Sequence, residues 1–305
     1  MARTRFIPDA GLTVRMTAVM FLLGALFVAL VVTLMFWIGG DSPALVMLIG
    51  VIGIGVAFFQ WWNSDKAALR AMGAREVTPE EAPELHGMID RLCALADMPK
   101  PRVAIADTDL PNAFATGRSP SRSAVCVTTG ILRTLTAEEL EAVLAHELSH
   151  VAHRDVLVMT VASSAGILAG MVTRGAQFGG LGLGRSRNGG GAIGFVVVLL
   201  ISLVVYAMSF LLLRLLSRYR ELCADRSGAY LTQRPSALAS ALTKISGEMN
   251  TVPERDLRAA QPMNAFFIAP AVRGLTLRTL TATHPPLEQR LDQLARIAAS
   301  LGQTL

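Results

Sequence analysis

The chain has 305 residues, of which 52% are hydrophobic and only 17% are charged, and its formal net charge is +5. Soluble globular domains usually carry about 25% charged residues, so the composition argues against an ordinary soluble protein and favours one that lies in a membrane. The three cysteines form no closely spaced pair and fall in segments that we expect in the cytoplasm, which favours reduced thiols.

Four apolar stretches account for the scarcity of charge. A helix needs roughly 20 mostly apolar residues to cross a bilayer, and each stretch is close to or above that length. We therefore expect four transmembrane helices, at Met16–Ile38, Pro43–Trp62, Val156–Thr173 and Ala192–Leu213. The first is longer than the apolar core of a signal peptide, which has about 7–15 residues, and no small-residue cleavage site follows it.

The distribution of Lys and Arg predicts the orientation of these helices. Basic residues beside membrane helices concentrate on the cytoplasmic side. Most of them favour a cytoplasmic location for both termini and for Asn63–Asp155, whereas Arg174, Arg185 and Arg187 argue the other way. We expect a multi-pass protein of the inner (plasma) membrane. Its positive charge then anchors it beside the bilayer, and no basic and aromatic pattern indicates a nucleic-acid partner.

The membrane segments divide the chain into five parts. These are a cytoplasmic N-terminus (1–15), two membrane helices (16–62), a polar region (63–155), a membrane hairpin (156–213) and a second polar region (214–305). Each polar region alone has few patterned elements for an independent domain. We therefore expect the two to fold together at the membrane face.

Local patterns predict the elements of the first polar region. A capping box predicts a helix over Thr78–Ala96. Arg102–Asp107 and Ser123–Thr129 are rich in β-branched residues and predict a small sheet. A second capping box begins a further helix at Thr136. The glycine-rich Gly179–Gly194 lacks a nucleotide-binding spacing and is expected to be a flexible connector on the far side of the membrane.

The helix that begins at Thr136 carries His146-Glu147-Leu148-Ser149-His150, which is the pattern HExxH. Residues four apart lie on one helix face, so both imidazoles can reach one metal ion, and Glu147 can address a water molecule on it. The alternative is a helix with surface histidines. The apolar residues around the motif favour buried side chains that need a partner. His153 lies about 10 Å along the axis from His146, too far to bind the same ion, and is expected to be a surface or supporting residue.

A third ligand is expected where the membrane hairpin returns. His150 lies about 9 Å from the start of the third membrane helix, and Glu221 lies about 12 Å past the end of the fourth. The hairpin therefore brings Glu221 to the depth of His150. Asp225 follows one turn later on the same face, where it can orient a ligand histidine. The alternative is an interfacial helix on which Glu221 and Asp225 are solvated charges.

Taken together, the motifs resemble those of the HtpX family of membrane-bound zinc metalloproteases, within the wider class that includes the prenyl-protein protease Ste24. The matching segments are PNAFATGR (Pro111–Arg118), TTGIL (Thr128–Leu132), EELEAVLAHELSHVAHRD (Glu138–Asp155), ELCAD (Glu221–Asp225) and THPPLEQR (Thr283–Arg290). The resemblance covers almost the whole chain. It implies a mainly α membrane protein with a small β-sheet, four transmembrane helices and a zincin-like protease domain, marked by HExxH and ExxAD, at the membrane face.

The resemblance also implies a role for each residue of the metal site. His146, His150 and Glu221 would bind one zinc ion per chain, which leaves a fourth position open for water. Glu147 would take a proton from that water and pass it to the leaving amine. Asp225 would orient a ligand histidine from behind.

Two further groups are implied to act on the substrate. His284 and Arg290 would stabilise the oxyanion of the tetrahedral intermediate, which needs a positioned donor; the alternative for His284 is an exposed side chain before a Pro-Pro turn. Asn112, Ala113 and Phe114 would form an edge strand that binds extended substrate by backbone pairing. The alternative for these three residues is a plain sheet strand.

We therefore expect a zinc endopeptidase that hydrolyses peptide bonds at the cytoplasmic face of the membrane, in misfolded or damaged membrane proteins under stress. Its partners would be protein or peptide substrates and the lipid bilayer. The first alternative is a prenyl-protein-type protease with a lipidated substrate. The second is a catalytically silent membrane scaffold that keeps the metal as a structural element, although such a protein has no need for Glu147.

Overall fold

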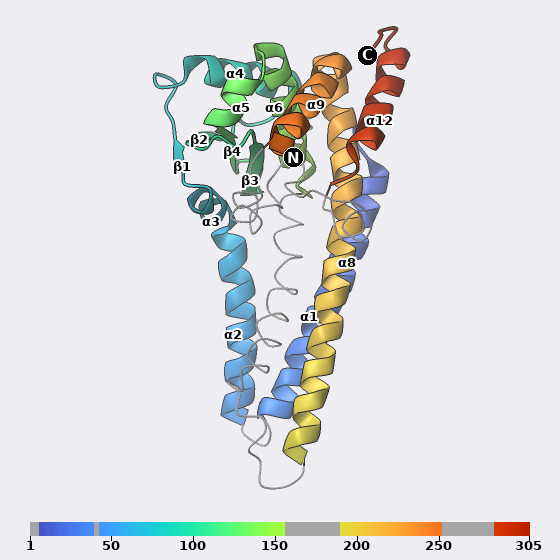
Figure 1. The fold of residues 1–305 in the computed structure, drawn as a ribbon. Helices are drawn as coiled ribbons and strands as arrows, with labels where there is room; N and C mark the ends of the chain where they lie inside the picture. The colour runs from blue at the N-terminus through green and yellow to red at the C-terminus, as the bar shows by residue number, and fades with distance from the viewer. Residues whose placement is uncertain (1–5, 40–42, 156–189, 252–283) are drawn as a thin grey trace. The chain divides into compact units, whose positions relative to one another are not determined.

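In the computed structural model the described residues are 6–39, 43–155, 190–251 and 284–305 (Figure 1). The chain separates into two units. The globular unit comprises Met1–Leu12, Ser64–Leu157 and Ser217–Leu305, and the helical unit comprises Thr13–Asn63 and Val158–Leu216. Both polar regions of the sequence therefore contribute to the globular unit.

The helical unit contains most of α1 (Ala10–Gly39), α2 (Pro43–Trp62) and the first part of α8 (Gly190–Thr232) (Figure 1). Large apolar side chains lie on the outside of these helices, and Phe21 and Ile54 are 76% and 69% exposed. Apolar surface of this extent is rare on soluble monomers and typical of segments that contact lipid or another protein.

Two helices in the described part of the chain are long and apolar enough to cross a membrane. They are Ala10–Met35 within α1 and Val196–Thr232 within α8, and they correspond to the first and fourth expected spans. The second expected span coincides with α2, whose crossing of a membrane stays a prediction. The third expected span, at 156–173, lies outside the described residues. Two of the four expected spans are therefore found.

The globular unit contains a four-stranded sheet in the order β1-β2-β4-β3. The strands are β1 (Ala74–Glu76), β2 (Arg102–Ala106), β3 (Ala113–Ser119) and β4 (Arg122–Thr128). β2 and β4 are parallel, and the two outer pairs are antiparallel. The predicted strands at 102–107 and 123–129 agree with β2 and β4 to within one residue at each end. In this sheet β3 is an edge strand.

The helix predicted over Thr78–Ala96 begins later than expected: α4 spans Pro83–Ala96. Glu81 does reach back to the backbone of Thr78, where its Oε2 accepts a hydrogen bond from the amide N at 2.8 Å, but this contact closes a turn. The reason is Pro83, which has no N–H and whose ring would clash with the carbonyl four residues earlier inside a helix. At the first position of α4 that proline is tolerated.

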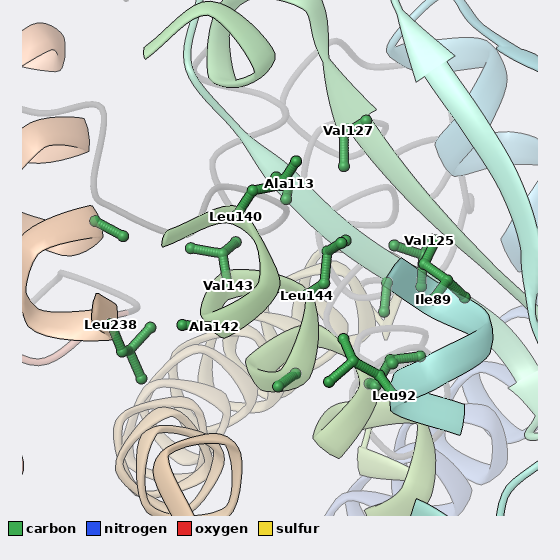
Figure 2. Close-up of a cluster of buried hydrophobic side chains, with 14 of the residues drawn as sticks. Ile89, Leu92, Ala113, Val125, Val127, Leu140, Ala142, Val143, Leu144 and Leu238 are labelled. Atoms are coloured by element: carbon green, nitrogen blue, oxygen red, sulfur yellow. The ribbon is translucent and has the colours of Figure 1, made fainter. Parts of the chain in front are cut away.

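The capping box at Thr136 is confirmed, and α6 (Ala137–His153) lies at the centre of the globular unit. Its apolar face packs against α4, α9 (Pro235–Thr251) and the strands β3 and β4. Figure 2 shows Val143 and Leu144 of this helix among side chains from α4, α9 and the sheet. Leu144 is fully buried. The core therefore fixes the position of α6, the helix that carries HExxH.

Three further helices belong to the described part of the globular unit. They are α3 (Ser64–Ala71), α5 (Thr129–Thr134) and α12 (Leu287–Ser300). α12 packs against α9 and adds Leu294 and Ile297 to the core. The described part is thus mainly helical with one small mixed sheet, as expected.

The N-terminal segment before α1 belongs to the globular unit. Phe6 is buried in its core, and the carbonyl of Ile7 lies 3.2 Å from Nε2 of His153 at the end of α6. Asp9 caps α1 by accepting a hydrogen bond from the backbone N–H of Leu12 at 2.7 Å. Its other oxygen accepts one from Arg226 of α8 at 2.6 Å. The segment thereby connects the start of the chain to two helices that come much later in the sequence.

Candidate metal centre

Two imidazoles and a carboxylate converge at a buried point in the globular unit. Nε2 of His146 and Nε2 of His150, both on α6, lie 3.2 Å apart. Each also lies 3.5 Å from an oxygen of Glu221 on α8. The three residues are at most 4% exposed, and their ligand atoms all lie within 4.8 Å of one another.

The spacing of these donor atoms fits a zinc ion. Zinc–nitrogen and zinc–oxygen bonds are about 2.0–2.2 Å, so two ligands of a tetrahedral ion are roughly 3.4 Å apart. Three protein ligands of this kind leave one coordination position open, which is typical of catalytic sites. Two imidazoles and one carboxylate are thus a complete donor set for a catalytic zinc ion.

A close approach of two helix backbones brings Glu221 to the histidines. A Cβ atom added at Gly228 of α8 would lie 2.9 Å from the backbone N of His146. No side chain fits in that space, so only glycine allows α8 to pack against α6 at this depth. Sequence reasoning placed Glu221 at the depth of His150 but did not identify this glycine.

Behind His146 lies a chain of charged groups. Its Nδ1 is 2.9 Å from Oδ1 of Asp225, and Asp225 accepts two hydrogen bonds from the guanidinium of Arg290, at 2.7 and 2.6 Å. Burial by itself would lower the pKa of His146, but the carboxylates of Asp225 and Glu221 raise it to about 9. Asp225 therefore stabilises positive charge at this ring, whether a proton or a metal ion supplies it.

Arg290 and His284 both reach the site from the C-terminal region. The guanidinium of Arg290 from α12 is buried against Asp225 in the paired geometry that makes arginine–carboxylate contacts strong. His284 is 3% exposed, with Nδ1 3.2 Å from an oxygen of Glu221. The alternative of an exposed His284 is therefore wrong, and both side chains belong to the centre.

Glu147 lies beside the ligands and contacts the sheet. Its Oε2 accepts a hydrogen bond from the backbone N–H of Ala115 in β3 at 2.9 Å. Burial raises the pKa of Glu147, which moves this carboxyl group towards the range in which it can both take and give a proton. The contact holds it against the edge strand on which Ala113 and Phe114 also lie; Asn112 immediately precedes that strand.

His153 does not reach the metal centre. Its Nδ1 lies 2.8 Å from the carbonyl of Ser149, and its Nε2 faces the carbonyl of Ile7. The rise of a straight helix predicts this outcome, because His153 is almost two turns away from His146.

Two residues of the centre escaped the sequence reasoning. Asp155 lies 2.8 Å from Nδ1 of His150, and Arg220 donates a hydrogen bond to Glu221 at 2.9 Å. Both looked like charges at the edge of a membrane segment. Asp155 reaches back because Arg154 ends α6 in a left-handed conformation, with φ 57°, and helix periodicity carries no sign of such a reversal. The only signal for Arg220 is its position next to Glu221.

Comparisons with known proteins show what the chain is similar to. The family model described as "Peptidase family M48" matches residues 79–298. The chain is 53% identical to Protease HtpX homolog 1 of Streptomyces coelicolor over 99% of this chain and 97% of that one. It is 50% identical to Protease HtpX homolog of Moorella thermoacetica over 97% of both chains. It is 49% identical to Protease HtpX homolog 2 of Methanosarcina acetivorans, over 96% and 98%.

The fold is similar to that of a solved structure. The crystal structure of Ste24p from S. mikatae matches with a TM-score of 0.51 and 16% sequence identity, over 94% of this chain and 66% of that one. The family model covers most of the chain, and the relatives match it along nearly its whole length. The chain therefore belongs to peptidase family M48 and is a metalloprotease.

Proposed function

We propose that this metalloprotease is a zinc-dependent endopeptidase embedded in the inner membrane, with its active site at the cytoplasmic face. The observation that carries the proposal is the convergence of His146, His150 and Glu221 on one point beside Glu147. The protease domain would be formed by residues 63–155 and 214–305. Retention of Glu147 next to a complete ligand set favours an enzyme over a silent scaffold.

Each group of the centre has a distinct part in peptide-bond hydrolysis. Zinc, when bound, supplies a Lewis acid that lowers the pKa of water to about 7 and polarises the scissile carbonyl. Glu147 takes the proton of the attacking water and returns it to the leaving amine nitrogen. The N–H of Ala115 holds one carboxylate oxygen of Glu147, which leaves the other to receive that proton. Asp225 keeps His146 oriented from behind.

Stabilisation of the oxyanion is assigned to His284 and Arg290. Nδ1 of His284 faces Glu221, whereas its buried Nε2 has no hydrogen-bond partner among the described residues, so we assign Nε2 as the donor to a substrate oxygen. Arg290 is bound to Asp225, and its positive charge lies in the same buried region. We assign the direct contact to His284 and a supporting electrostatic role to Arg290.

Substrate is proposed to bind along β3 in extended form. β3 is an edge strand of the sheet, and edge strands can pair with one more segment through backbone hydrogen bonds. Ala113 and Phe114 would contribute that pairing. Asn112 uses its backbone N–H on Thr128 of β4, so we assign its contribution to the side chain. This arrangement recognises backbone rather than side chains, which suits a protease that cleaves unfolded segments.

The proposed membrane insertion and orientation are supported by α1, α8 and the basic residues around them. Both helices are apolar over a membrane-spanning length, and Lys and Arg are richer beside the segments proposed to be cytoplasmic. An active site next to the bilayer has direct access to misfolded or damaged membrane proteins, which we propose as substrates under stress.

Removal and return of the metal tests this proposal. The full chain is purified in detergent with a chelator, and casein cleavage is followed while zinc is added. We expect no cleavage without metal and recovery at one zinc per chain. Cleavage that persists in excess chelator, or a full zinc site without cleavage, would contradict a zinc endopeptidase.

A further inference from the structure

We propose that Asp155 is a positioning residue for the metal ligand His150, and this inference rests on the zinc site proposed above. Asp155 accepts the N–H of Nδ1 and thereby directs the lone pair of Nε2 to the metal. Asp225 holds the corresponding place at His146, where its Oδ1 lies 2.9 Å from Nδ1 of the ring. The centre would then contain one carboxylate behind each histidine, supplied by two different parts of the chain.

The contact has the geometry of a strong hydrogen bond. Oδ2 of Asp155 lies 2.8 Å from Nδ1 of His150, and the aspartate is 1% exposed. A neutral imidazole carries one N–H, and a metal binds the nitrogen that lacks it. An acceptor fixed at Nδ1 keeps the proton there, so Nε2 is free. Nε2 of His150 is also the atom that points to Nε2 of His146 and to Glu221.

The ring of His150 needs such a support because the two imidazoles are crossed. Their planes meet at 90°, with centroids 4.8 Å apart. Rotation of either ring about its side-chain bonds would separate the two Nε2 atoms. A carboxylate behind each ring opposes that rotation, and conserving this orientation is worth about 10–100-fold in metal affinity in other proteins.

The two supporting aspartates differ in their own partners. Asp225 is neutralised by the paired contact with Arg290. Asp155 has one oxygen on His150, and its buried Oδ1 has no hydrogen-bond partner in the described part of the chain. A carboxylate buried for stability alone would be expected to satisfy both oxygens. The charge of Asp155 is balanced at longer range by Arg220, which interacts electrostatically with Asp155 and Glu221.

Asp155 reaches this position through the end of α6. The chain reverses at Arg154, whose left-handed backbone cap bonds back to the carbonyl of Val151. The residue that follows is thereby directed at the last turn of the helix, where His150 lies. A continued helix would place Asp155 about 140° around the axis from His150.

The test measures zinc affinity rather than activity. The variant Asp155→Asn keeps the size of the side chain but removes its charge, and its amide N–H can stabilise the wrong imidazole tautomer. The matched control is Asp9→Asn, which alters another buried aspartate of the globular unit that contacts Arg226 and no ligand. Zinc affinity is measured by competition with a chromophoric chelator. Stability is measured by heat unfolding of the metal-free protein, and ligand geometry by the visible spectrum of the Co²⁺ form.

We expect Asp155→Asn to bind zinc about 10–100-fold more weakly than the wild type, with a shifted Co²⁺ spectrum. Its metal-free melting temperature should fall no more than that of Asp9→Asn, which should bind zinc like the wild type. Unchanged zinc affinity in Asp155→Asn, or equal weakening in Asp9→Asn, would overturn the role of Asp155. A wild type that binds no zinc would instead overturn the metal site itself.

A second variant covers the case in which the neutral residue does not fold. Asp155→Glu keeps the negative charge beside Arg220 but moves the carboxylate by one methylene group. If geometry matters, its zinc affinity should also fall and its Co²⁺ spectrum should change. Wild-type affinity in this variant would show that only the charge is needed and would overturn the positioning role.

Discussion

The two units of this protein distribute polar and apolar groups in opposite ways. The globular unit buries charged side chains: Glu147, Glu221, Asp225 and Arg290 are each at most 4% exposed. The helical unit instead exposes large apolar side chains, such as Phe21 and Val51. In water both arrangements are unfavourable, since buried charge loses hydration and exposed hydrocarbon orders solvent.

The difference shows what each unit has to satisfy. Every buried charge named above has a charged or hydrogen-bonding partner in the same centre. These ion pairs and hydrogen bonds offset the free energy lost when the charges leave water. In the described part of the helical unit the buried polar side chains are hydroxyls, those of Ser202 and Ser209. Ser202 bonds to a carbonyl of its own helix. The described residues of the helical unit therefore include no His, Cys, Asp or Glu that could bind a metal ion. Its apolar surface is compatible with the interior of a lipid bilayer.

The largest effect should come from the buried charges. Glu147→Gln keeps the shape of the side chain and removes the base, so hydrolysis should fall by about 10²–10⁴-fold. Zinc should stay bound, because His146, His150 and Glu221 are unchanged. The measurement is casein cleavage together with zinc content. Near wild-type cleavage at full zinc content would show that Glu147 is not the base.

The apolar core of the globular unit offers the next contrast. Leu144→Ala should reduce the free energy of unfolding by about 2–5 kcal/mol, because the side chain is fully buried in α6 and leaves a cavity. Leu132→Ala on α5 is the control, since Leu132 is 36% exposed. Heat unfolding of the metal-free protein in detergent measures both. Equal shifts would mean that the core does not position α6 as described.

The outside of the helical unit should respond to charge rather than to size. Val51→Arg in α2 should disfavour membrane insertion by about 2.5–3.5 kcal/mol if the residue lies at the centre of the span. Val51→Leu, which only adds a methylene group, should insert normally. Because α1 and α8 would keep the chain in the membrane in either case, insertion of α2 is measured by the side of the membrane on which a reporter fused after Trp62 is found. If both variants insert equally, α2 does not cross the bilayer.

A smaller effect is expected where a charge links two helices of the globular unit. Burial by itself would raise the pKa of Glu139, but hydrogen bonds from Lys244, Ser240 and Thr136 lower it to about 2. A carboxylate whose pKa is lower in the folded state stabilises the fold at pH values above its ordinary pKa of 4.5. This stabilisation is lost as the pH falls from 4.5 towards 2. Because Lys244 is partly exposed, the contribution should be about 1 kcal/mol.

Glu139→Gln tests that contribution. Its melting temperature should lie below that of the wild type at pH 7, and the gap should narrow as the pH falls from 4.5 towards 2. Glu138→Gln changes an exposed neighbour that contacts Arg234 and should have little effect. If the difference in melting temperature stays constant with pH, the lost stability comes from the capping box of α6 rather than from the charge of Glu139.

The sequence predicted those parts of the fold that depend on local pattern. The capping box of α6, the strands β2 and β4, and the apolar helices α1, α2 and α8 all leave periodic or compositional signals. The predicted start of α4 was wrong by four residues, because the N-cap is Ala82 rather than Thr78 and Pro83 takes the first helical position. The two histidines of the metal group were predictable because HExxH places them on one helix face by periodicity, whereas Glu221 on α8 needed the argument from the depth of the membrane hairpin.

The remaining parts of the centre depend on contacts between distant segments. Asp155 needs the reversal at Arg154, and Gly228 matters only because α6 lies against it. Arg290 comes from a helix whose partner, Asp225, is 65 residues earlier in the chain. No local pattern specifies such pairs, so they appear only once the helices are packed. Family resemblance named Arg290 for the site without revealing what it contacts.

The contact of Asp9 with Arg226 has a consequence for how the protein is made. These residues are 217 positions apart, and at about 5–20 residues per second their synthesis is separated by roughly 10–45 seconds. During that interval α1 has already been synthesised, but Arg226, which binds its capping residue Asp9, has not. The metal ligand Glu221 is made only five residues before Arg226, so the ligand set and the N-terminal contact become complete together. A growing chain therefore lacks a complete set of metal ligands until it is nearly three-quarters synthesised.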